Sequence, residues 1–398
     1  MKKIKFFLMA FVAMTLTAGI ASCGDDNDNV TPNVTSKTDT VYVDKPVDGS
    51  NWNRYQQLVT ADVKAKKQNS KAILLVAFGS TWEQAFAAFD STVVAYNKDS
   101  RFDGYDVFLS FSSAICINRA AAGENVDPRN FYAPPFWLNA FAAEGVRYEE
   151  IVVQSLQVIP GEEYTRVINY IKDFANNANG DLDDEYLANV TLKLGVPLLQ
   201  DKDTDVPEVA KRLDALYSDK AASDIVAFMG HGNPDSYDTY KANQRYDDLE
   251  KELQTNYSPN YFVGTVDMMK NFKTHVYERM KPLANTGKKV YLHPLMSIDG
   301  DHGHNDMAGD DLPKGVDEDN YTFDQLQALA NEEGEVEYTS WKRYFGANGS
   351  GFTCNDETMI NLGLLELETI RDVWMQHTDD AIKGEPLDFY HSMYPEAE

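Results

Sequence analysis

Seven apolar runs of strand length are the feature that most constrains the fold of this chain. Each run is continuous rather than alternating, which is typical of parallel strands that are covered on both faces. Segments with helical periodicity separate the runs, and strands that alternate with helices predict right-handed crossovers in an open α/β sheet. The runs are 72–78, 107–111, 151–159, 190–199, 225–229, 261–266 and 290–298.

The length of the chain predicts more than one domain. A chain of 398 residues is too long for one small core, and two α/β domains are the natural expectation. We predict two similar Rossmann-like or flavodoxin-like domains whose parallel sheets face a central cleft. The N-terminal domain is expected over 66–187 and the C-terminal domain over 188–390, with the boundary after the charged stretch NGDLDDEY.

The first residues have the pattern of a targeting segment. Three lysines precede the apolar stretch 6–18, and the residues IASC follow and end at Cys23. This resembles a bacterial lipoprotein signal, in which residues 1–22 are removed and Cys23 carries the lipid; an ordinary secretory signal is the alternative. Residues 23–65 are predicted to be a lipid-anchored flexible tether, because their first half is polar and lacks periodicity. The predicted location is the cell envelope, facing the periplasm or on the outer membrane.

Charge and cysteine content limit the partners. The formal net charge of −27 argues against nucleic-acid binding, which needs clustered lysine and arginine. An anionic small ligand is still compatible with this net charge, because a local basic pocket can lie inside an acidic shell.

Cys116 and Cys354 are the cysteines beyond the signal. They either form a disulfide in an oxidising envelope or stay as two buried thiols.

Polar clusters follow three of the predicted strands, where open α/β sheets bind their ligands. His231 follows the run 225–229, Glu162 and Glu163 follow 151–159, and Asp301-His302 follows 290–298. Two facing domains would bring a carboxylate pair and two histidine sites to one cleft. Imidazole and carboxylate together suit a divalent first-row transition metal such as Co²⁺, Ni²⁺, Fe²⁺ or Zn²⁺. The residues alone therefore predict a two-domain α/β protein with a metal site.

Each of these features also has a plain structural interpretation. A His-Gly turn such as that at His231 is often only a capped strand end, and exposed loop histidines are common. His293 lies inside an apolar run, so we expect a hydrogen-bonded core histidine there. The aromatic stretch 131–141 is either a cofactor shelf or a core helix, and a proline that starts an apolar helix favours the core. A metallophosphoesterase is disfavoured, because the first strand lacks the Asp-x-His end of that family.

The ordered strand ends resemble those of the anaerobic cobalt chelatases of cobalamin biosynthesis, the CbiK type, within the ATP-independent chelatase superfamily. The resemblance covers about residues 71 to 380 and rests on several motifs in the family's order. These are KAILLVAFGST (71–81), FSSAICINR (111–119), VVQSLQVIPGEEY (152–164), LGVPLL (194–199), FMGHG (228–232), VGTVD (263–267) and PLMSIDGDHGHNDMAGDD (294–311), followed by SWK (340–342).

The resemblance implies a chelatase-like fold and an enzyme that inserts a divalent metal into a tetrapyrrole such as sirohydrochlorin without ATP. Co²⁺ is the expected substrate metal, with Fe²⁺ and Ni²⁺ as alternatives. Glu163, His231 and His302 correspond to the family's metal ligands, with Glu163 and His231 as the catalytic pair. His231 is our choice for the base that accepts a pyrrole proton, because an imidazole titrates near neutrality. Asp301 would shape the loop that carries His302, together with Asn305 and Asp306.

Some assignments stay open within the resemblance. Ser112, Arg119 and Asp301 are predicted to bind the tetrapyrrole, although a structural role is as plausible for Ser112 and Arg119. Gln157 stands where many members have histidine. His304 stands where an apolar residue is common, and it is either an extra ligand or, as we favour, a solvated neighbour. The acidic insertion 312–339 is either a lid or partner surface beside the cleft or, as we favour, a solvated loop.

The expected envelope location departs from the cytoplasmic assembly of cobalamin. It suggests that haem or another scavenged porphyrin is the ring and iron the metal. The alternative function is a non-catalytic lipoprotein that binds haem, another tetrapyrrole or metal for uptake. A purely structural lipoprotein is disfavoured by the polar strand ends. The expected partners are a tetrapyrrole and, through the lipid, a membrane; a homo-oligomer stays open.

Overall fold

The structure, a computed structural model, describes residues 52–123, 127–310, 321–336 and 339–387. The predicted signal peptide, the lipidation site Cys23, most of the predicted tether and part of the insertion 312–339 lie outside these residues. All structural statements below concern the described ranges.

Four parallel strands form the first sheet, in the order β2-β1-β3-β4. The central strand β1 pairs with β2 on one side and β3 on the other, so that Ile73 lies opposite both Val107 and Val152. The side chains of β1 from Ala72 to Ala77 are fully buried, as expected for a strand covered on both faces. The strands are β1 (Lys71–Ala77), β2 (Tyr105–Phe111), β3 (Glu150–Ser155) and β4 (Thr191–Gly195).

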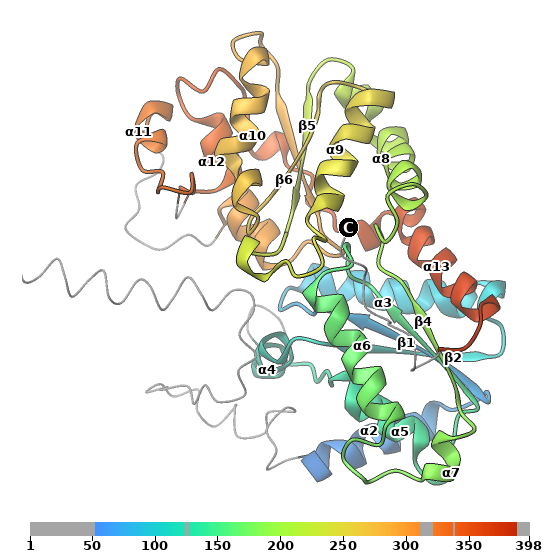
Figure 1. Ribbon diagram of the computed structural model, residues 1–398. Coiled ribbons are helices and arrows are strands. Elements are labelled where there is room, and N and C mark those ends of the chain that lie inside the picture. Colours follow the sequence, from blue (N-terminus) through green and yellow to red (C-terminus); the bar gives the residue numbers. More distant parts are fainter. Residues whose placement is uncertain (1–51, 124–126, 311–320, 337–338, 388–398) are drawn as a thin grey trace, which may run out of the picture. The chain divides into compact units, whose positions relative to one another are not determined.

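Three parallel strands form the second sheet, in the order β6-β5-β7. They are β5 (Ile225–Gly230), β6 (Tyr261–Thr265) and β7 (Val290–Leu295). Each of the seven apolar runs thus forms a strand, and the predicted α/β class with two parallel sheets is confirmed (Figure 1).

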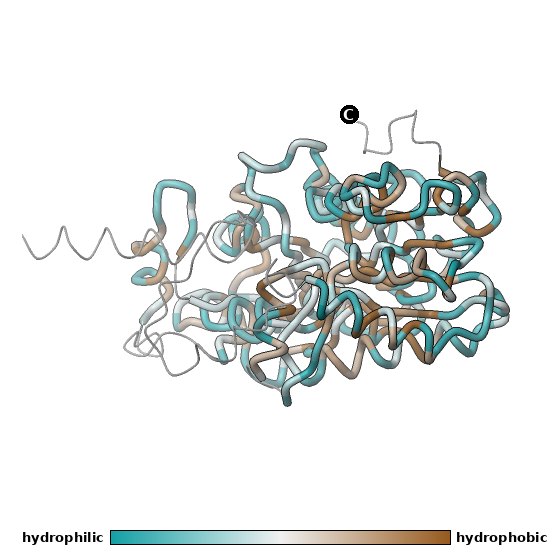
Figure 2. Tube along the Cα trace, turned by 90° about the horizontal axis from the view of Figure 1, so that it is seen from below, coloured by the Kyte–Doolittle hydropathy of each residue, from teal (hydrophilic) through white to brown (hydrophobic). Residues whose placement is uncertain are grey.

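Helices connect and cover the strands (Figure 1). They are α2 (Trp52–Lys66), α3 (Glu83–Lys98), α4 (Ala114–Ala122), α5 (Pro134–Ala142), α6 (Glu162–Ala175), α7 (Asp184–Leu187), α8 (Asp205–Ala221), α9 (Gln244–Asn256), α10 (Lys273–Met280), α11 (Phe323–Gln327), α12 (Trp341–Gly346) and α13 (Glu368–Lys383). Figure 2 shows hydrophobic residues in brown and hydrophilic residues in teal alternating along the Cα trace. No helix among the described residues has both the length and the apolar character needed to cross a membrane.

Helix α2 corrects the predicted tether. Its residues Tyr55, Val59 and Val63 are buried, and the Trp52 ring packs on Phe136 of α5 with the centroids 4.1 Å apart. The tether prediction is therefore wrong for residues 52–65, because an apolar face with helical spacing follows the polar stretch. The aromatic stretch 131–141 supplies the other side of this contact, which confirms its interpretation as core.

The predicted domain boundary divides the first sheet. β4 lies on the C-terminal side of that boundary, yet it pairs with β3. The C-terminal helix α13 also packs on this sheet: Trp374 donates from Nε1 to the Gln157 carbonyl at 3.1 Å, and the Leu387 amide donates to Leu192 at 2.9 Å. The structure thus places β4 and α13 with the first sheet, because the apolar face of α13 is buried there.

The described part of the insertion, residues 321–336, is mostly exposed but packs on the second sheet's helices through a few buried side chains. Phe323 and Leu326 of α11 are buried, and the Phe323 ring lies 4.2 Å from that of Tyr277 on α10. Thr274 and His275 of α10 contact the carbonyls of Gly334 and Glu333. The favoured solvated-loop interpretation is wrong for Phe323 and Leu326, which anchor α11, while most other residues of this stretch are exposed as expected. Figure 1 shows α11 beside α12 and α10.

The two cysteines are free thiols in the structure, so the disulfide alternative is not realised. Cys354 belongs to the core of the second sheet, whereas Cys116 packs against the core of the first. Burial raises the pKa of the Cys116 thiol to about 11 and that of Cys354 to about 12, so both are protonated at neutral pH. They behave as small packing groups.

His293 is the core histidine that the apolar run predicted. Its side chain on β7 is fully buried, and Nδ1 donates to the Pro294 carbonyl at 2.8 Å. The Tyr217 and Phe228 rings pack edge-on against the imidazole, with centroids 5.2 and 5.6 Å away. Burial in this apolar site lowers the pKa of His293 to about 4, because it penalises the charged form.

This burial predicts an acid-sensitive stability. Between about pH 6.5 and pH 4 the unfolded chain takes up a proton on His293 that the folded chain does not. The free energy of unfolding should therefore fall by about 3 kcal/mol as the pH drops through this window. In the His293→Leu variant this part of the pH dependence should vanish. Urea unfolding at pH 7 and pH 4.5 checks it; an equal loss in both proteins would refute the assignment.

Candidate functional site at the carboxyl ends of the strands

Two predicted ligand histidines meet at the carboxyl edge of the second sheet. His231 follows the central strand β5, and His302 follows its neighbour β7. Their rings are arranged edge to face, with centroids 4.6 Å apart and an interplanar angle of 86°. The sequence places these residues 71 positions apart, so the parallel pairing of β5 with β7 is what brings the imidazoles together.

The His231 ring is oriented by its immediate surroundings. Nδ1 donates to the Gly232 carbonyl at 2.7 Å and lies 3.6 Å from Oδ2 of Asp267, which follows β6. Donation from Nδ1 puts the lone pair on Nε2, the usual way in which a neighbouring acceptor fixes the tautomer of a ligand histidine. Gly232 has a φ of +80°, which favours glycine in this turn.

His302 lies at the start of a π-helix, Gly303–Ala308. π-Helical turns are rare and are frequent at functional sites. The His302 Nδ1 donates to Oδ2 of Asp306 at 2.7 Å, which orients this ring as Gly232 orients that of His231. Burial opposes ionisation of Asp306, but the hydrogen bond and charge of His302 outweigh it, so that the pKa of Asp306 lies below its usual value.

Glu163 approaches from the first sheet, in the first turn of α6. Burial raises the pKa of its carboxyl group above the usual value, and the charge of Asp267 adds to that rise. The charges of His231, Arg166 and His302 act in the opposite direction. Glu163 therefore lies within electrostatic reach of both imidazoles, although it belongs to the other sheet.

Direct contacts hold the helix of Glu163 against the loop of His231. A Cβ atom on Gly161, the residue that caps α6, would lie 2.7 Å from Nδ2 of Asn233, so a larger residue at 161 would displace the Asn233 side chain. Oε1 of Glu162 accepts a hydrogen bond from the Thr239 amide at 3.2 Å. The carboxyl edges of the two sheets thus meet beside the imidazole pair.

The predicted ligand set is only partly assembled. The imidazoles of His231 and His302 are adjacent, whereas the carboxyl group of Glu163 interacts with both through charge: their positive charges act to lower its pKa. Within the described ranges, no three His, Cys, Asp or Glu side chains are close enough together to hold one ion. The metal-ligand roles of these residues stay predictions. The site therefore contains two oriented imidazoles. Near them lies the carboxyl group of Glu163, whose pKa is raised by burial.

Asp267 is a site residue that the sequence interpretation missed. It ends the motif VGTVD, whose residues carry no predicted chemical role. Its Oδ2 is enclosed and has no hydrogen-bond partner within the described chain, while the Asp267 amide donates to the His231 carbonyl at 3.0 Å. A polar residue directly after a predicted strand was the signal that could have identified it.

The three predicted tetrapyrrole-binding residues are placed differently. Ser112 is buried at the end of β2, and its amide donates to the Ala77 carbonyl. Arg119 lies in the last turn of α4, half-buried. Asp301 is exposed and accepts hydrogen bonds from Trp82 Nε1 at 3.3 Å and Asn305 Nδ2 at 3.1 Å. Asp301 thus bonds to one residue beyond the first sheet, Trp82, and to one beyond the second sheet, Asn305. Tetrapyrrole binding by Ser112, Arg119 and Asp301 stays a prediction.

His304 is not the solvated neighbour that we favoured. Its ring stacks on Trp82, with centroids 3.7 Å apart and planes 8° apart, and Nδ1 donates to Asp310 at 3.0 Å. Its Nε2 is enclosed and has no hydrogen-bond partner in the described structure. The sequence interpretation failed because the stacking partner comes from the other sheet, 222 positions away.

Gln157, which stands where many family members have histidine, is 5% exposed beyond the end of β3. Its Oε1 accepts from the Ser155 hydroxyl, while Nε2 is enclosed without a hydrogen-bond partner within the described chain.

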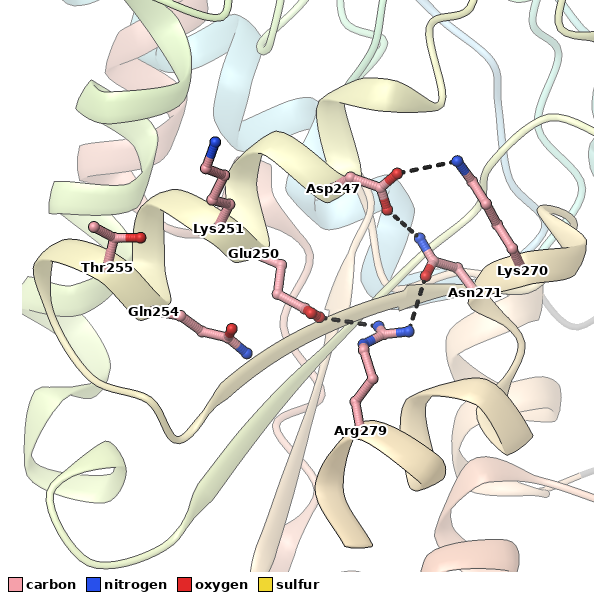
Figure 3. Close-up of a pocket in the computed structure, with 8 residues that line it drawn as sticks. All are labelled: Asp247, Glu250, Lys251, Gln254, Thr255, Lys270, Asn271 and Arg279. Atoms are coloured by element: carbon pink, nitrogen blue, oxygen red, sulfur yellow. Dashed lines mark hydrogen bonds and ion pairs between the residues drawn. The ribbon is translucent and has the colours of Figure 1, made fainter. Parts of the chain in front are cut away.

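A separate pocket of about 350 Å³ lies between α9 and α10 (Figure 3). Its side chains bind the backbone of β6, the edge strand of the second sheet. Glu250 accepts from the Val263 amide at 2.6 Å, Arg279 donates to the Val263 carbonyl at 2.7 Å, and Gln254 donates to the Tyr261 carbonyl at 2.7 Å. Capping of an exposed strand edge prevents pairing with another strand. This pocket therefore has a structural explanation and is not the candidate site.

Comparison with known proteins identifies the family of this chain. Residues 71–321 match the family described as cobalt chelatase (CbiK). The chain belongs to the cobalt chelatase family. The matched residues of this chelatase include Glu163, His231 and His302, together with all seven strands.

Two curated relatives of this chelatase are sirohydrochlorin cobaltochelatases. The protein CbiKC of Nitratidesulfovibrio vulgaris is 28% identical over 319 residues, which cover 79% of this chain and 91% of the relative. The protein of Salmonella typhimurium is 28% identical over 243 residues, which cover 61% and 81%. The solved structure described as SirB from Bacillus subtilis with Fe3+ has a TM-score of 0.45 and 13% identity, and the match covers 80% of this chain and 99% of that one.

Proposed function

We propose that this chelatase inserts a divalent metal into a tetrapyrrole, with Co²⁺ and sirohydrochlorin as the substrate pair and without ATP. The observation that carries the proposal is the adjacent pair of imidazoles, His231 and His302, in a member of the cobalt chelatase family. Both curated relatives are named for this reaction, and they support the choice of Co²⁺. Fe²⁺ is the second metal to test, because the proposed envelope location differs from that of cobalamin assembly.

The chemistry requires a site that holds the metal and then releases it. Insertion removes two pyrrole N–H protons and transfers the ion from protein ligands to four ring nitrogens. We propose that Nε2 of His231 and Nε2 of His302 bind the ion, because Gly232 and Asp306 accept from the Nδ1 atoms. Glu163 would complete the ligand set on closure of the loops. A loosely assembled set favours transfer, since tightly held ligands would retain the ion.

Proton removal needs a base beside the ion. We propose His231 for this role, with Asp267 placed 3.6 Å from its Nδ1 to stabilise the charged ring. As the metal leaves Nε2 of His231 for the macrocycle, this nitrogen can accept one of the two pyrrole protons, and the second is released to solvent. The Gly232 carbonyl keeps the imidazole ring in place.

An absorbance assay tests the proposal. The mature protein is mixed with sirohydrochlorin and Co²⁺, without ATP, and the rate of the metalation spectrum is compared with the rate without protein. We expect a rate increase of at least 100-fold, a contribution typical of positioned acid–base catalysis alone. The competing function, an uptake lipoprotein, predicts tight haem binding with no acceleration, and that result would replace our proposal.

We further propose that the protein is anchored to the envelope by lipid on Cys23. The support is the signal-like segment that ends at this residue. In the producing bacterium, the Cys23→Ala variant should move from the detergent phase to the aqueous phase on detergent partitioning. A variant that stays in the detergent phase would contradict lipidation at this cysteine.

A further inference from the structure

Trp82 connects the first sheet to the loop that carries His302. It lies at the start of α3, beyond the carboxyl end of β1, and is half-buried. Its indole contacts the loop twice: the ring stacks on His304, and Nε1 donates to Oδ1 of Asp301 at 3.3 Å. We call Trp82, Asp301 and His304 the clasp.

The two loop residues of the clasp flank the predicted ligand. Asp301 directly precedes His302, and His304 follows it by two positions. The loop is also tied internally, since His302 bonds to Asp306, His304 to Asp310, and Asn305 to Asp301. A short, tied segment moves as a unit, so fixing Asp301 and His304 against Trp82 also fixes the backbone of His302.

The clasp matters because the predicted ligands come from both sheets. Glu163 belongs to the first sheet, whereas His231 and His302 belong to the second. The loop of His231 is held to the first sheet by the contacts of Asn233 with Gly161 and of Thr239 with Glu162. The clasp makes the corresponding connection for the loop of His302. We therefore expect the distance between Glu163 and His302 to depend on Trp82.

A second tie supports this position of α3. Nε2 of Gln84, two residues after Trp82, donates to the Asn361 carbonyl at 2.6 Å and to Glu366 at 3.1 Å. The amides of Leu364 and Leu365 donate to the carbonyls of Met296 and Ser297, which directly follow β7. Through residues 361–366, the start of α3 is thus joined to the residues that directly follow β7, in addition to its contacts with Asp301 and His304.

We propose that the clasp is a positioning device for metal binding: Trp82, through its stack on His304 and its hydrogen bond to Asp301, sets the place of His302 relative to Glu163. This inference rests on the proposed function for its biological meaning, but its physical content concerns Co²⁺ binding alone. Trp82 touches neither ion nor macrocycle in this account, and it acts through His302.

Titration of the mature protein with Co²⁺ alone tests the clasp. Trp82→Ala should weaken Co²⁺ binding by about 10-fold or more, the usual effect of losing a group that orients a ligand. Trp82→Phe keeps a flat ring for the stack and should recover most of the affinity. Trp52→Ala is the matched control, because it removes a tryptophan that also packs on an aromatic ring, with its centroid 4.1 Å from that of Phe136, but lies away from the loop. It should leave the Co²⁺ affinity unchanged.

The double variant Trp82→Ala/His304→Ala adds a test of mechanism. Because both changes break one contact, its Co²⁺ affinity should match that of the weaker single variant rather than the product of both losses. Equal Co²⁺ affinity in Trp82→Ala and the parent would overturn the clasp, as would an equal loss in Trp52→Ala. Circular dichroism verifies folding, and His304→Ala alone gives the same test if Trp82→Ala does not fold.

The outcome for the clasp is separable from that for the proposed function. If Trp82→Ala weakens Co²⁺ binding and the parent still fails to accelerate metalation, the clasp stands and the chelatase proposal fails. If the parent accelerates metalation and Trp82→Ala has the same Km for Co²⁺ and the same kcat, the clasp fails and the chelatase proposal stands. A raised Km for Co²⁺ with a nearly unchanged kcat is the expected pattern.

Discussion

The His302→Ala variant is expected to lose Co²⁺ insertion by at least about 100-fold, with little change in folding. His302 is half-buried at the start of the π-helix, outside both hydrophobic cores, so its removal opens no cavity in the core. It takes away one of two adjacent imidazoles and leaves Asp306 without its hydrogen-bond donor. Loss of a group that merely orients a ligand costs 10- to 100-fold in metal affinity or activity, and loss of a ligand should cost more.

A second histidine provides the control for this variant. His275 lies on α10 and contacts the Glu333 carbonyl through Nε2, outside the imidazole pair. His275→Ala should metalate at the rate of the parent, as followed by the absorbance of the cobalt product. Parental activity in His302→Ala would remove this residue from the site, and equal losses in both variants would indicate a general effect of histidine removal.

The Glu163→Gln variant should bind Co²⁺ about 10- to 100-fold more weakly, and with a shallower pH dependence. Glutamine keeps the shape of the side chain and removes its charge. Burial raises the pKa of Glu163, so protons compete with the metal at a higher pH than for an ordinary carboxyl group. As the pH falls, Co²⁺ binding to the parent should weaken through this raised pKa, in addition to the effect of the histidines.

Calorimetry in buffers of different ionisation enthalpy measures the protons released on Co²⁺ binding. The parent should release up to one more proton than Glu163→Gln near the raised pKa. Arg166→Gln is a suitable comparison, because it removes a charge that lowers the pKa of Glu163 while keeping the carboxyl group. It should move the pH dependence upward without abolishing it. Identical proton release in the parent and in Glu163→Gln would show that Glu163 does not bind the ion.

Local pattern explains which parts of the fold could be predicted. The strands were predictable because a parallel strand buried on both faces leaves a continuous apolar run, as in β1 and β5. His293 was predictable for the same reason. The domain boundary was not, because the pairing of β4 with β3 depends on which edge is available, and no local residue encodes that choice.

In the site, too, local sequence pattern predicts some residues, whereas the contacts between distant segments cannot be predicted from it. His231, Glu163 and His302 could be singled out because polar residues directly follow strands, and parallel strands collect such residues at one edge. The clasp could not be predicted, because the stack of Trp82 on His304 joins loops from both sheets and leaves no spacing signal. The edge-to-face pair of His231 and His302 likewise follows from the strand order β6-β5-β7, which periodicity does not determine.

The central claim is that Glu163, His231 and His302 bind one substrate metal between the two sheets. A crystal structure of the mature protein soaked with Co²⁺, with anomalous data at the cobalt edge, tests it most directly. We predict one strong peak within about 2.0–2.2 Å of a nitrogen on each imidazole and an oxygen of Glu163, the usual lengths for such bonds. A cobalt peak on His304 and Asp310 instead, or one that lacks either imidazole, would contradict the account.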